Sequence, residues 1–166
     1  LLRIEENLKK KNLYFESNRG KSIRVGLFKA IKNYELLQQN IEVEEKEIKS
    51  IKEFTGTEEL DLKKDWYEAF QNVEQEEKDY LLGLLEAGED LEKPARIWTS
   101  TIHAIKGGEQ DNVILCLDMG DKILKAIKRS QDKEDEEHRV WYVGVTRAKN
   151  NLYKLKAKIY NRGYKI

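Results

Sequence analysis

Residues 96–118 read RIWTSTIHAIKGGEQDNVILCLD, two apolar stretches on either side of a polar loop that contains glycine. Residues 96–100 are strand-like, and the run from Val113 to Leu117 is apolar at every position. A continuous apolar run of this length is typical of a strand in a parallel sheet that is covered on both faces. The segment therefore predicts a strand, a loop and a second strand of an α/β fold.

The sequence beyond this segment continues the alternation of elements. We expect a helix over residues 122–129, a charged loop or helix start over residues 131–137, a helix over residues 138–148 and a strand over residues 151–159. Strands that alternate with helices indicate an α/β sheet of mostly parallel strands. The length of 166 residues fits one domain.

The sequence before the segment is mostly helical. Residues 1–11 predict an amphipathic helix, residues 13–15 a short strand, and Ser22 the cap of a helix that runs to about residue 39. Residues 42–92 are rich in helix formers and poor in β-branched residues, and we interpret them as a helical insertion.

Within residues 42–92 we expect three helices. A break at residues 55–57 separates the first from a further helix, and Asp65 starts another that continues to Leu85.

Composition excludes several classes of protein. Charged residues make up 37% of the chain, no apolar run approaches the ~20 residues that span a bilayer, and no secretory signal is present, so we expect no membrane association. Cys116 is the single cysteine, and we expect it to be a buried, inert core thiol. Without a second cysteine no internal disulfide can form, which favours the reducing cytoplasm. No metal site is expected, because the two histidines are isolated from each other and from Cys116.

Formal net charge is zero, but the charges are segregated along the chain. The stretch from residue 19 to 32 is basic, residues 42–92 lean acidic, and the last 20 residues are basic again. This distribution permits a local phosphate-binding surface on a neutral protein.

Gly20-Lys21-Ser22 resembles the end of a phosphate-binding P-loop, G-x-x-x-x-G-K-[ST]. With Asp118 after an apolar strand, it would make the chain a small nucleotide-binding enzyme. The pattern requires glycine where this chain has Phe15, and that glycine gives the loop the freedom to wrap phosphates. We therefore interpret these residues as a turn and keep the P-loop enzyme as the weakest alternative.

Two segments indicate a specific function. Residues 101–109 read TIHAIKGGE, and residues 136–149 read EEHRVWYVGVTRAK. They resemble motifs V and VI of UvrD/Rep-like superfamily 1 helicases, approximately T-x-H-x-x-K-G-L-E and E-E-R-R-L-x-Y-V-G-V-T-R-A, in the same order and at a similar separation. Gly108 stands where that family usually has leucine.

The resemblance implies that residues 1–166 are the second, C-terminal motor domain of a DNA helicase. Such a domain has a RecA-like three-layer architecture. Tyr142, Val143 and Val145 would be core contacts of the motif VI helix. The chain would be a fragment of an ATP hydrolase, inactive by itself, that works with an N-terminal RecA-like domain of the same protein.

The resemblance also assigns residues to the nucleotide. Arg147 would be the catalytic arginine finger, which stabilises transition-state charge on ATP. Glu109 would accept a hydrogen bond from the ribose, and Gly107 would let the backbone approach the ligand closely. ATP with Mg²⁺ would be bound chiefly by the absent first domain.

Three further residues would contact DNA. Thr101, His103 and Lys106 carry groups that donate to phosphate oxygens, and by resemblance their loop touches the backbone of single-stranded or duplex DNA. ATP-driven translocation on single-stranded DNA is therefore the expected function. The alternative is a non-catalytic nucleic-acid-binding module that inherited the helicase fold.

Overall fold

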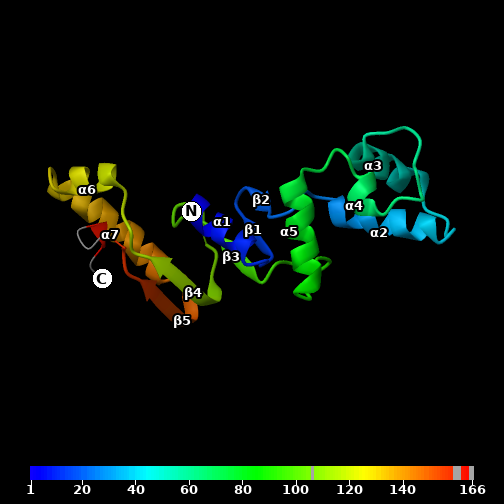
Figure 1. The fold of residues 1–166 in the computed structure, drawn as a ribbon. Helices are drawn as coiled ribbons and strands as arrows, with labels where there is room; N and C mark the ends of the chain where they lie inside the picture. Colours follow the sequence, from blue (N-terminus) through cyan, green and yellow to red (C-terminus); the bar gives the residue numbers. More distant parts are fainter. Residues whose placement is uncertain (106, 159–161, 165–166) are drawn as a thin grey trace. The chain divides into compact units, whose positions relative to one another are not determined.

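The computed structural model describes residues 1–105, 107–158 and 162–164. The chain divides into two compact units, unit 1 over Leu1–Thr99 and unit 2 over Ser100–Ile166. Each unit contains both helices and a small sheet (Figure 1), which confirms the mixed α/β class expected from the sequence. No helix among the described residues is long and apolar enough to cross a membrane.

Unit 1 contains a three-stranded sheet with the order β2-β1-β3. Strand β1 (Phe15–Ser17) pairs antiparallel with β2 (Gly20–Lys21) and parallel with β3 (Ile97–Thr99), with Phe15 opposite Ile97. The parallel pair joins two segments that are about 80 residues apart in sequence. The strands expected near residues 13–15 and 96–100 are therefore neighbours.

Five helices make up the rest of unit 1: α1 (Leu2–Lys10), α2 (Leu27–Gln38), α3 (Glu45–Thr55), α4 (Trp66–Ala69) and α5 (Gln75–Glu86). Their core centres on Phe70, which is completely buried. Tyr34 of α2 meets Phe70 edge-on at 5.5 Å, and Phe54 of α3 stacks on it at 6.2 Å. Such aromatic pairs stabilise beyond the area that they bury, so residues 42–92 and α2 share one core.

The start of α2 differs from the prediction. The helix begins at Leu27 after Gly26, whose φ is 85°, and not after Ser22. The Ser22 hydroxyl accepts a hydrogen bond from the Phe15 amide at 3.3 Å and is hydrogen-bonded to the Tyr80 hydroxyl at 3.0 Å. Ser22 therefore ties β1 to α5, and the strand–turn–helix geometry of a P-loop is not formed.

The helix expected after residue 57 is also wrong. The Tyr34 hydroxyl donates to the carbonyls of Asp61 at 2.6 Å and Lys64 at 2.9 Å, and the Gln38 amide donates to the Leu62 and Lys64 carbonyls. Side chains of α2 thus take the carbonyls that a helix would use itself. The single helix expected from Asp65 to Leu85 is divided into α4 and α5 by residues 70–74.

Unit 2 is built from β4 (Gln110–Cys116), α6 (Asp121–Ile127), α7 (Gln131–Val145) and β5 (Ala148–Leu155). Strands β4 and β5 pair in parallel, joined by a crossover through the two helices. The buried core consists of Leu115, Leu117, Met119 and Trp141.

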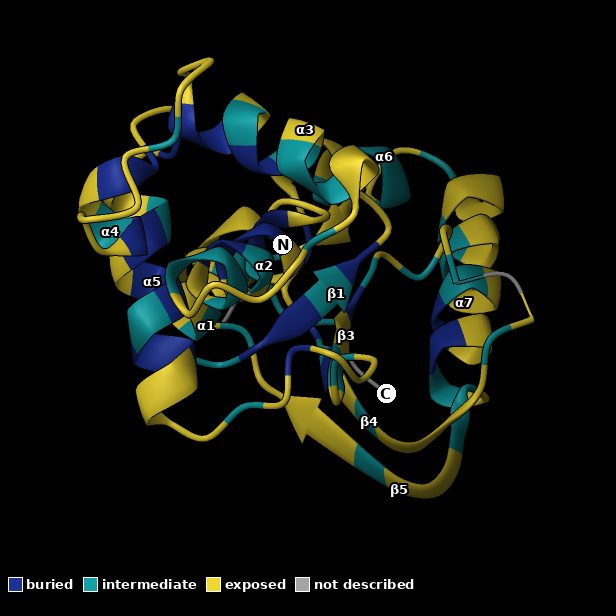
Figure 2. Ribbon diagram, turned by 90° about the vertical axis from the view of Figure 1, so that its right-hand side faces the viewer, coloured by how far each residue is buried: buried dark blue, intermediate teal, exposed yellow. Residues whose placement is uncertain are grey.

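The two faces of the β4–β5 sheet differ in burial. Leu115 of β4 packs with Trp141 of α7 on one face. On the other face Ile114 lies opposite Tyr153, and these side chains are 64% and 54% exposed. Figure 2 shows β5 exposed along most of its length. The apolar run predicted a strand covered on both faces, and within unit 2 only one face is covered.

Candidate functional site

The loop that resembles motif V follows directly on β3. The carbonyl and hydroxyl oxygens of Thr101 both accept from the Ala104 amide, at 3.1 and 3.3 Å. This turn leaves the side chains of Thr101 and His103 exposed. Lys106, the third residue expected to contact DNA, lies outside the described residues.

The glycines of this loop have different roles. Gly107 has a φ of 71°, a region that favours glycine because it has no β-carbon. The Gly108 amide donates to the Ile105 carbonyl at 3.3 Å and closes the turn. A β-carbon on Gly108 would lie 2.9 Å from Cγ1 of Ile105, so the Ile105 side chain fills the adjacent space.

Helix α7 carries the segment that resembles motif VI, and its inward face differs from the expectation. Trp141 and Gly144 are buried, and Val145 packs against the core cluster. Tyr142 is 70% exposed and Val143 is 37% exposed, so predicting them as core contacts was wrong. Positions three and four apart share one face of a helix, and 141, 144 and 145 occupy the inward face.

Motifs V and VI pack against each other at Gly144. A β-carbon at this position would lie 2.9 Å from Cδ1 of Ile102 and 3.2 Å from Cδ1 of Leu115. Glycine in a helix interior costs about 1 kcal/mol relative to alanine. Here it lets the motif V loop and β4 approach the α7 backbone closely.

Arg147 follows α7 and reaches back to the motif V loop. Its guanidinium donates to the Val143 carbonyl at 3.0 Å, the Gly108 carbonyl at 3.3 Å and the Thr146 hydroxyl at 3.2 Å. The Arg147 carbonyl accepts from the Gln110 amide at 2.9 Å. The fold therefore holds a half-buried, permanently charged group at the junction of the two motifs.

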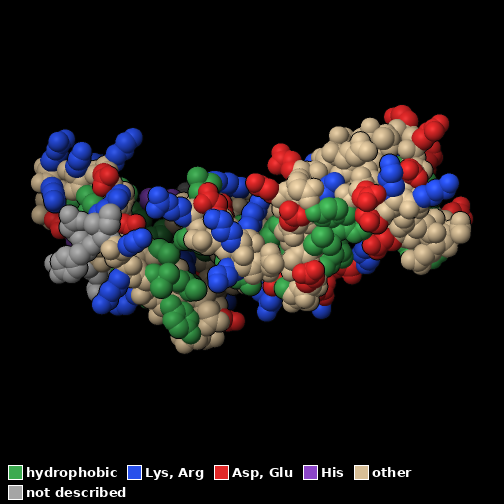
Figure 3. All heavy atoms as spheres, in the orientation of Figure 1, with side chains coloured by type: hydrophobic (Ala, Val, Ile, Leu, Met, Phe, Trp, Pro, Cys, Tyr) green, Lys and Arg blue, Asp and Glu red, His purple; other side chains and the backbone are tan. Residues whose placement is uncertain are grey.

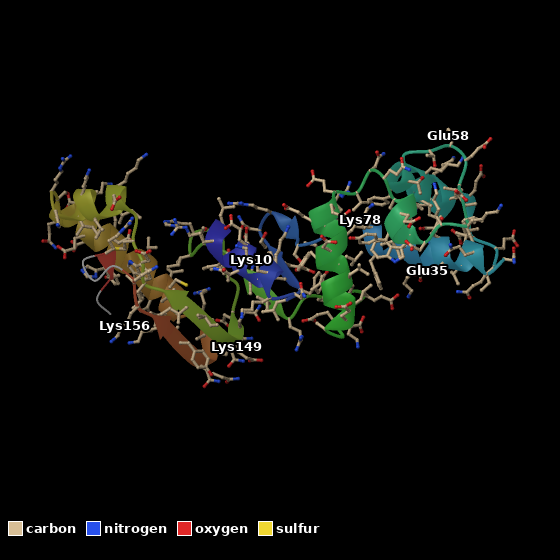
Figure 4. All side chains as sticks on the ribbon, in the orientation of Figure 1. Lys10, Glu35, Glu58, Lys78, Lys149 and Lys156 are labelled. Atoms are coloured by element: carbon tan, nitrogen blue, oxygen red, sulfur yellow. The ribbon has the colours of Figure 1, made fainter. Side chains whose placement is uncertain are left out.

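Glu109 lies beside this junction. Its carboxylate is 3.9 Å from the ammonium of Lys149, which projects from the start of β5 and is labelled in Figure 4. Both side chains are about half exposed. An exposed pair at this distance contributes little to stability, so the Glu109 carboxylate can exchange Lys149 for another donor.

The match to a family model decides the identity of this arrangement. The model of the UvrD-like helicase C-terminal domain matches residues 2–158. The chain belongs to this family. No curated protein and no solved structure matched the chain. Membership gives this UvrD-like domain the role of a helicase motor domain, for which the family implies nucleic acid and an N-terminal domain as partners.

This UvrD-like domain has no net charge, but its basic and acidic residues are distributed unequally between the two units. Unit 2 has 14 lysine and arginine residues against nine aspartate and glutamate residues, and unit 1 has 17 against 22. In Figure 3 the blue basic side chains are correspondingly more frequent over unit 2 and the red acidic ones over unit 1. The unit that holds motifs V and VI is thus the one with net positive charge, which suits a phosphate-rich partner.

Sequence reasoning missed two residues that join the motifs of this UvrD-like domain. Ile102 and Gly144 bring the motif V loop against α7, but neither carries a reactive group. One signal was available, because a glycine within a helix among large apolar neighbours often marks a close approach of another element. The partner of that glycine could not be read from the sequence.

Proposed function

We propose that the chain is the second motor domain of an ATP-dependent helicase that translocates on single-stranded DNA, with Arg147 as its arginine finger. The parallel β4–β5 pair and its helical crossover are the kind of unit from which RecA-like three-layer domains are built. This supports that architecture for the domain. The position of Arg147 at the junction of motifs V and VI carries the proposal.

The hydrogen bonds of Arg147 suit this role. A guanidinium has five N–H donors, and three of them are used by Val143, Gly108 and Thr146. Two donors remain for phosphate oxygens while the side chain stays anchored. An anchored charge needs little reorganisation when negative charge develops on a transferred phosphoryl group.

The nucleotide would be shared with a first motor domain. ATP with Mg²⁺ supplies the phosphoryl group and the metal that neutralises its charge. On this chain Arg147 would donate to phosphate oxygens, Glu109 would accept from a ribose hydroxyl in place of Lys149, and Gly107 would let the backbone come close. The exposure of the Glu109 carboxylate supports its availability.

DNA would bind at the motif V loop. The exposed Thr101 hydroxyl and His103 ring can both donate to phosphate oxygens, and Lys106 would add an ammonium group. The net positive charge of unit 2 favours an anionic strand. The Gly108 carbonyl accepts a hydrogen bond from Arg147. A shift of this loop on DNA binding would therefore move the Arg147 guanidinium directly.

The test is Arg147→Ala in a protein that joins this chain to its first motor domain. We expect DNA-stimulated ATP hydrolysis to fall by about 10³-fold or more, as for other arginine fingers. Arg129→Ala removes an exposed arginine just beyond α6 and should leave the rate unchanged. ATPase activity within about two-fold of the parent, with DNA binding retained, would contradict the finger role and favour the non-catalytic nucleic-acid-binding module.

A further inference from the structure

Residues 162–164, which we call the 162–164 strap, lie beyond the residues matched by the family model. We propose that this strap is a positioning element for α7 and thereby for Arg147, with Tyr164 as its principal residue. The inference rests on the proposed function, because it concerns how the finger is held. Three sets of contacts support it.

Backbone hydrogen bonds tie the strap to the chain that leaves β4. The Met119 amide donates to the Arg162 carbonyl at 3.0 Å, and the Tyr164 amide donates to the Leu117 carbonyl at 2.9 Å. Asp118 and Gly163 form an antiparallel bridge between these bonds. The strap is thus held by a single antiparallel bridge just beyond the end of β4.

The Arg162 side chain anchors the strap near the start of α6. Its guanidinium donates to the Met119 carbonyl at 3.3 Å and lies 3.3 Å from the Asp121 carboxylate and 3.9 Å from that of Asp118. A planar guanidinium can satisfy several acceptors at once. Arg162 therefore fixes the register in which Tyr164 reaches α7.

Tyr164 covers the buried tryptophan of α7. The two rings stack with centroids 4.7 Å apart and planes 9° apart, and Trp141 is only 5% exposed. The Tyr164 hydroxyl contacts Nδ1 of His138, one helical turn before Trp141. The buried indole N–H of Trp141 has no hydrogen-bond partner within the described part of the chain. Burying such a group costs free energy, which the packing of the surrounding rings and apolar side chains must offset.

The strap and the sheet hold Trp141 together. Tyr164 and Leu115 of β4 both pack in the cluster that contains the Trp141 side chain. Arg147 follows six residues after Trp141, and its guanidinium reaches Gly108 from the end of the same helix. Rotation or fraying of α7 would therefore move Arg147 from the motif V carbonyl, and Tyr164 resists that movement.

The first experiment uses this chain and hydrogen exchange of the α7 amides. Tyr164→Ala should accelerate exchange at the C-terminal half of α7 at least roughly five-fold, while Tyr164→Phe, which keeps the stacked ring, should stay near the parent. Tyr153→Ala removes an exposed tyrosine of the same unit and should not accelerate α7. Unchanged hydrogen exchange of the α7 amides in Tyr164→Ala would overturn the inference, whether or not Arg147 proves to be the arginine finger.

The second experiment measures ATP hydrolysis in a protein that contains both motor domains. Tyr164→Ala should lower kcat roughly ten-fold with little change in KM, since misplacing a catalytic group chiefly affects the transition state, and Tyr164→Phe should restore it. If Arg147→Ala lowers kcat but Tyr164→Ala does not, the positioning role is wrong. If Arg147→Ala has no effect, the proposed finger fails, and exchange alone decides whether the strap orders α7.

Discussion

The guanidinium of Arg147 donates to the carbonyl of Gly108 at 3.3 Å, which joins the end of α7 to the motif V loop. Gly108 departs from the leucine that UvrD/Rep-like helicases usually have there. The structure gives the reason, because a β-carbon at this position would lie 2.9 Å from the Ile105 side chain. Ile105 occupies the space that a larger residue at position 108 would need.

Gly108→Ala should therefore destabilise the chain unless Ile105 is shortened. The added methyl group overpacks the turn, and we expect the free energy of unfolding to fall by about 1–2 kcal/mol. Ile105→Ala in the same chain should recover most of that loss. Urea titration measures both, with Gly120→Ala as the control, because a β-carbon on Gly120 meets nothing within 4 Å. Additive effects of the substitutions at 105 and 108 would contradict the proposed crowding.

Gly144→Val tests the contact between motifs V and VI. A β-branched side chain at 144 must displace both Ile102 and Leu115, so we expect unfolding free energy to fall by about 2–3 kcal/mol. Ile102→Ala should offset part of this loss when combined with Gly144→Val. A double-mutant cycle gives the coupling, which should exceed about 1 kcal/mol. A coupling near zero would mean that the loop does not pack on α7 as described.

The sequence predicted the motifs better than it predicted the packing. Motifs V and VI were recognised from their amino-acid patterns, and the structure brings Gly108 of motif V into contact with Arg147 of motif VI. The inward face of α7 was misjudged, because the apolar Tyr142 and Val143 lie among other apolar residues and composition does not say which of them face the sheet. The functional roles of the residues in motifs V and VI stay predictions.

Secondary structure was also predicted incompletely where contacts with distant residues decide it. The helix expected after residue 57 does not form, because the side chains of Tyr34 and Gln38, more than 20 residues away, donate hydrogen bonds to the carbonyls of that segment. Tertiary contacts of this kind override local propensity and leave no local signal. Strand pairing is similar, since the apolar run of β4 indicated a strand but not that β5 would be its partner within unit 2.

Tyr80 should make stability fall at high pH. Burial raises the pKa of Tyr80 to about 12, and its hydroxyl donates to the Leu13 carbonyl at 2.6 Å. The unfolded chain loses this proton near pH 10 and the folded chain only near pH 12, so the stabilisation is complete below about pH 10 and lost as pH rises toward 12. Tyr80→Phe should cost about 1–2 kcal/mol at pH 7 and flatten this decline. Urea titrations from pH 8 to 11.5 measure it, and an equally steep decline in Tyr80→Phe would contradict the assignment.

Cys116 should react slowly with alkylating agents. Burial raises the pKa of the Cys116 thiol, with a smaller contribution from the Asp118 carboxylate, so less of the reactive thiolate is present at neutral pH. We expect iodoacetamide at pH 7.5 to modify the folded chain roughly ten-fold more slowly than the urea-unfolded chain. Mass spectrometry reports this without ambiguity, because the chain has one cysteine. Equal rates would show that the thiol is as accessible as in the unfolded chain.

His103→Ala should weaken binding of single-stranded DNA without changing stability. The ring is exposed on the motif V loop, so its removal leaves no cavity, while the loss of one hydrogen bond to phosphate should reduce affinity roughly two- to ten-fold. Fluorescence anisotropy of a labelled oligonucleotide measures the affinity, and urea titration the stability. Lys133→Ala is the control, because this exposed lysine of α7 is paired with Glu136 and lies outside the loop. Equal losses of affinity in the two variants would indicate a diffuse attraction to unit 2, and an unchanged affinity in His103→Ala would remove this residue from the DNA-binding surface.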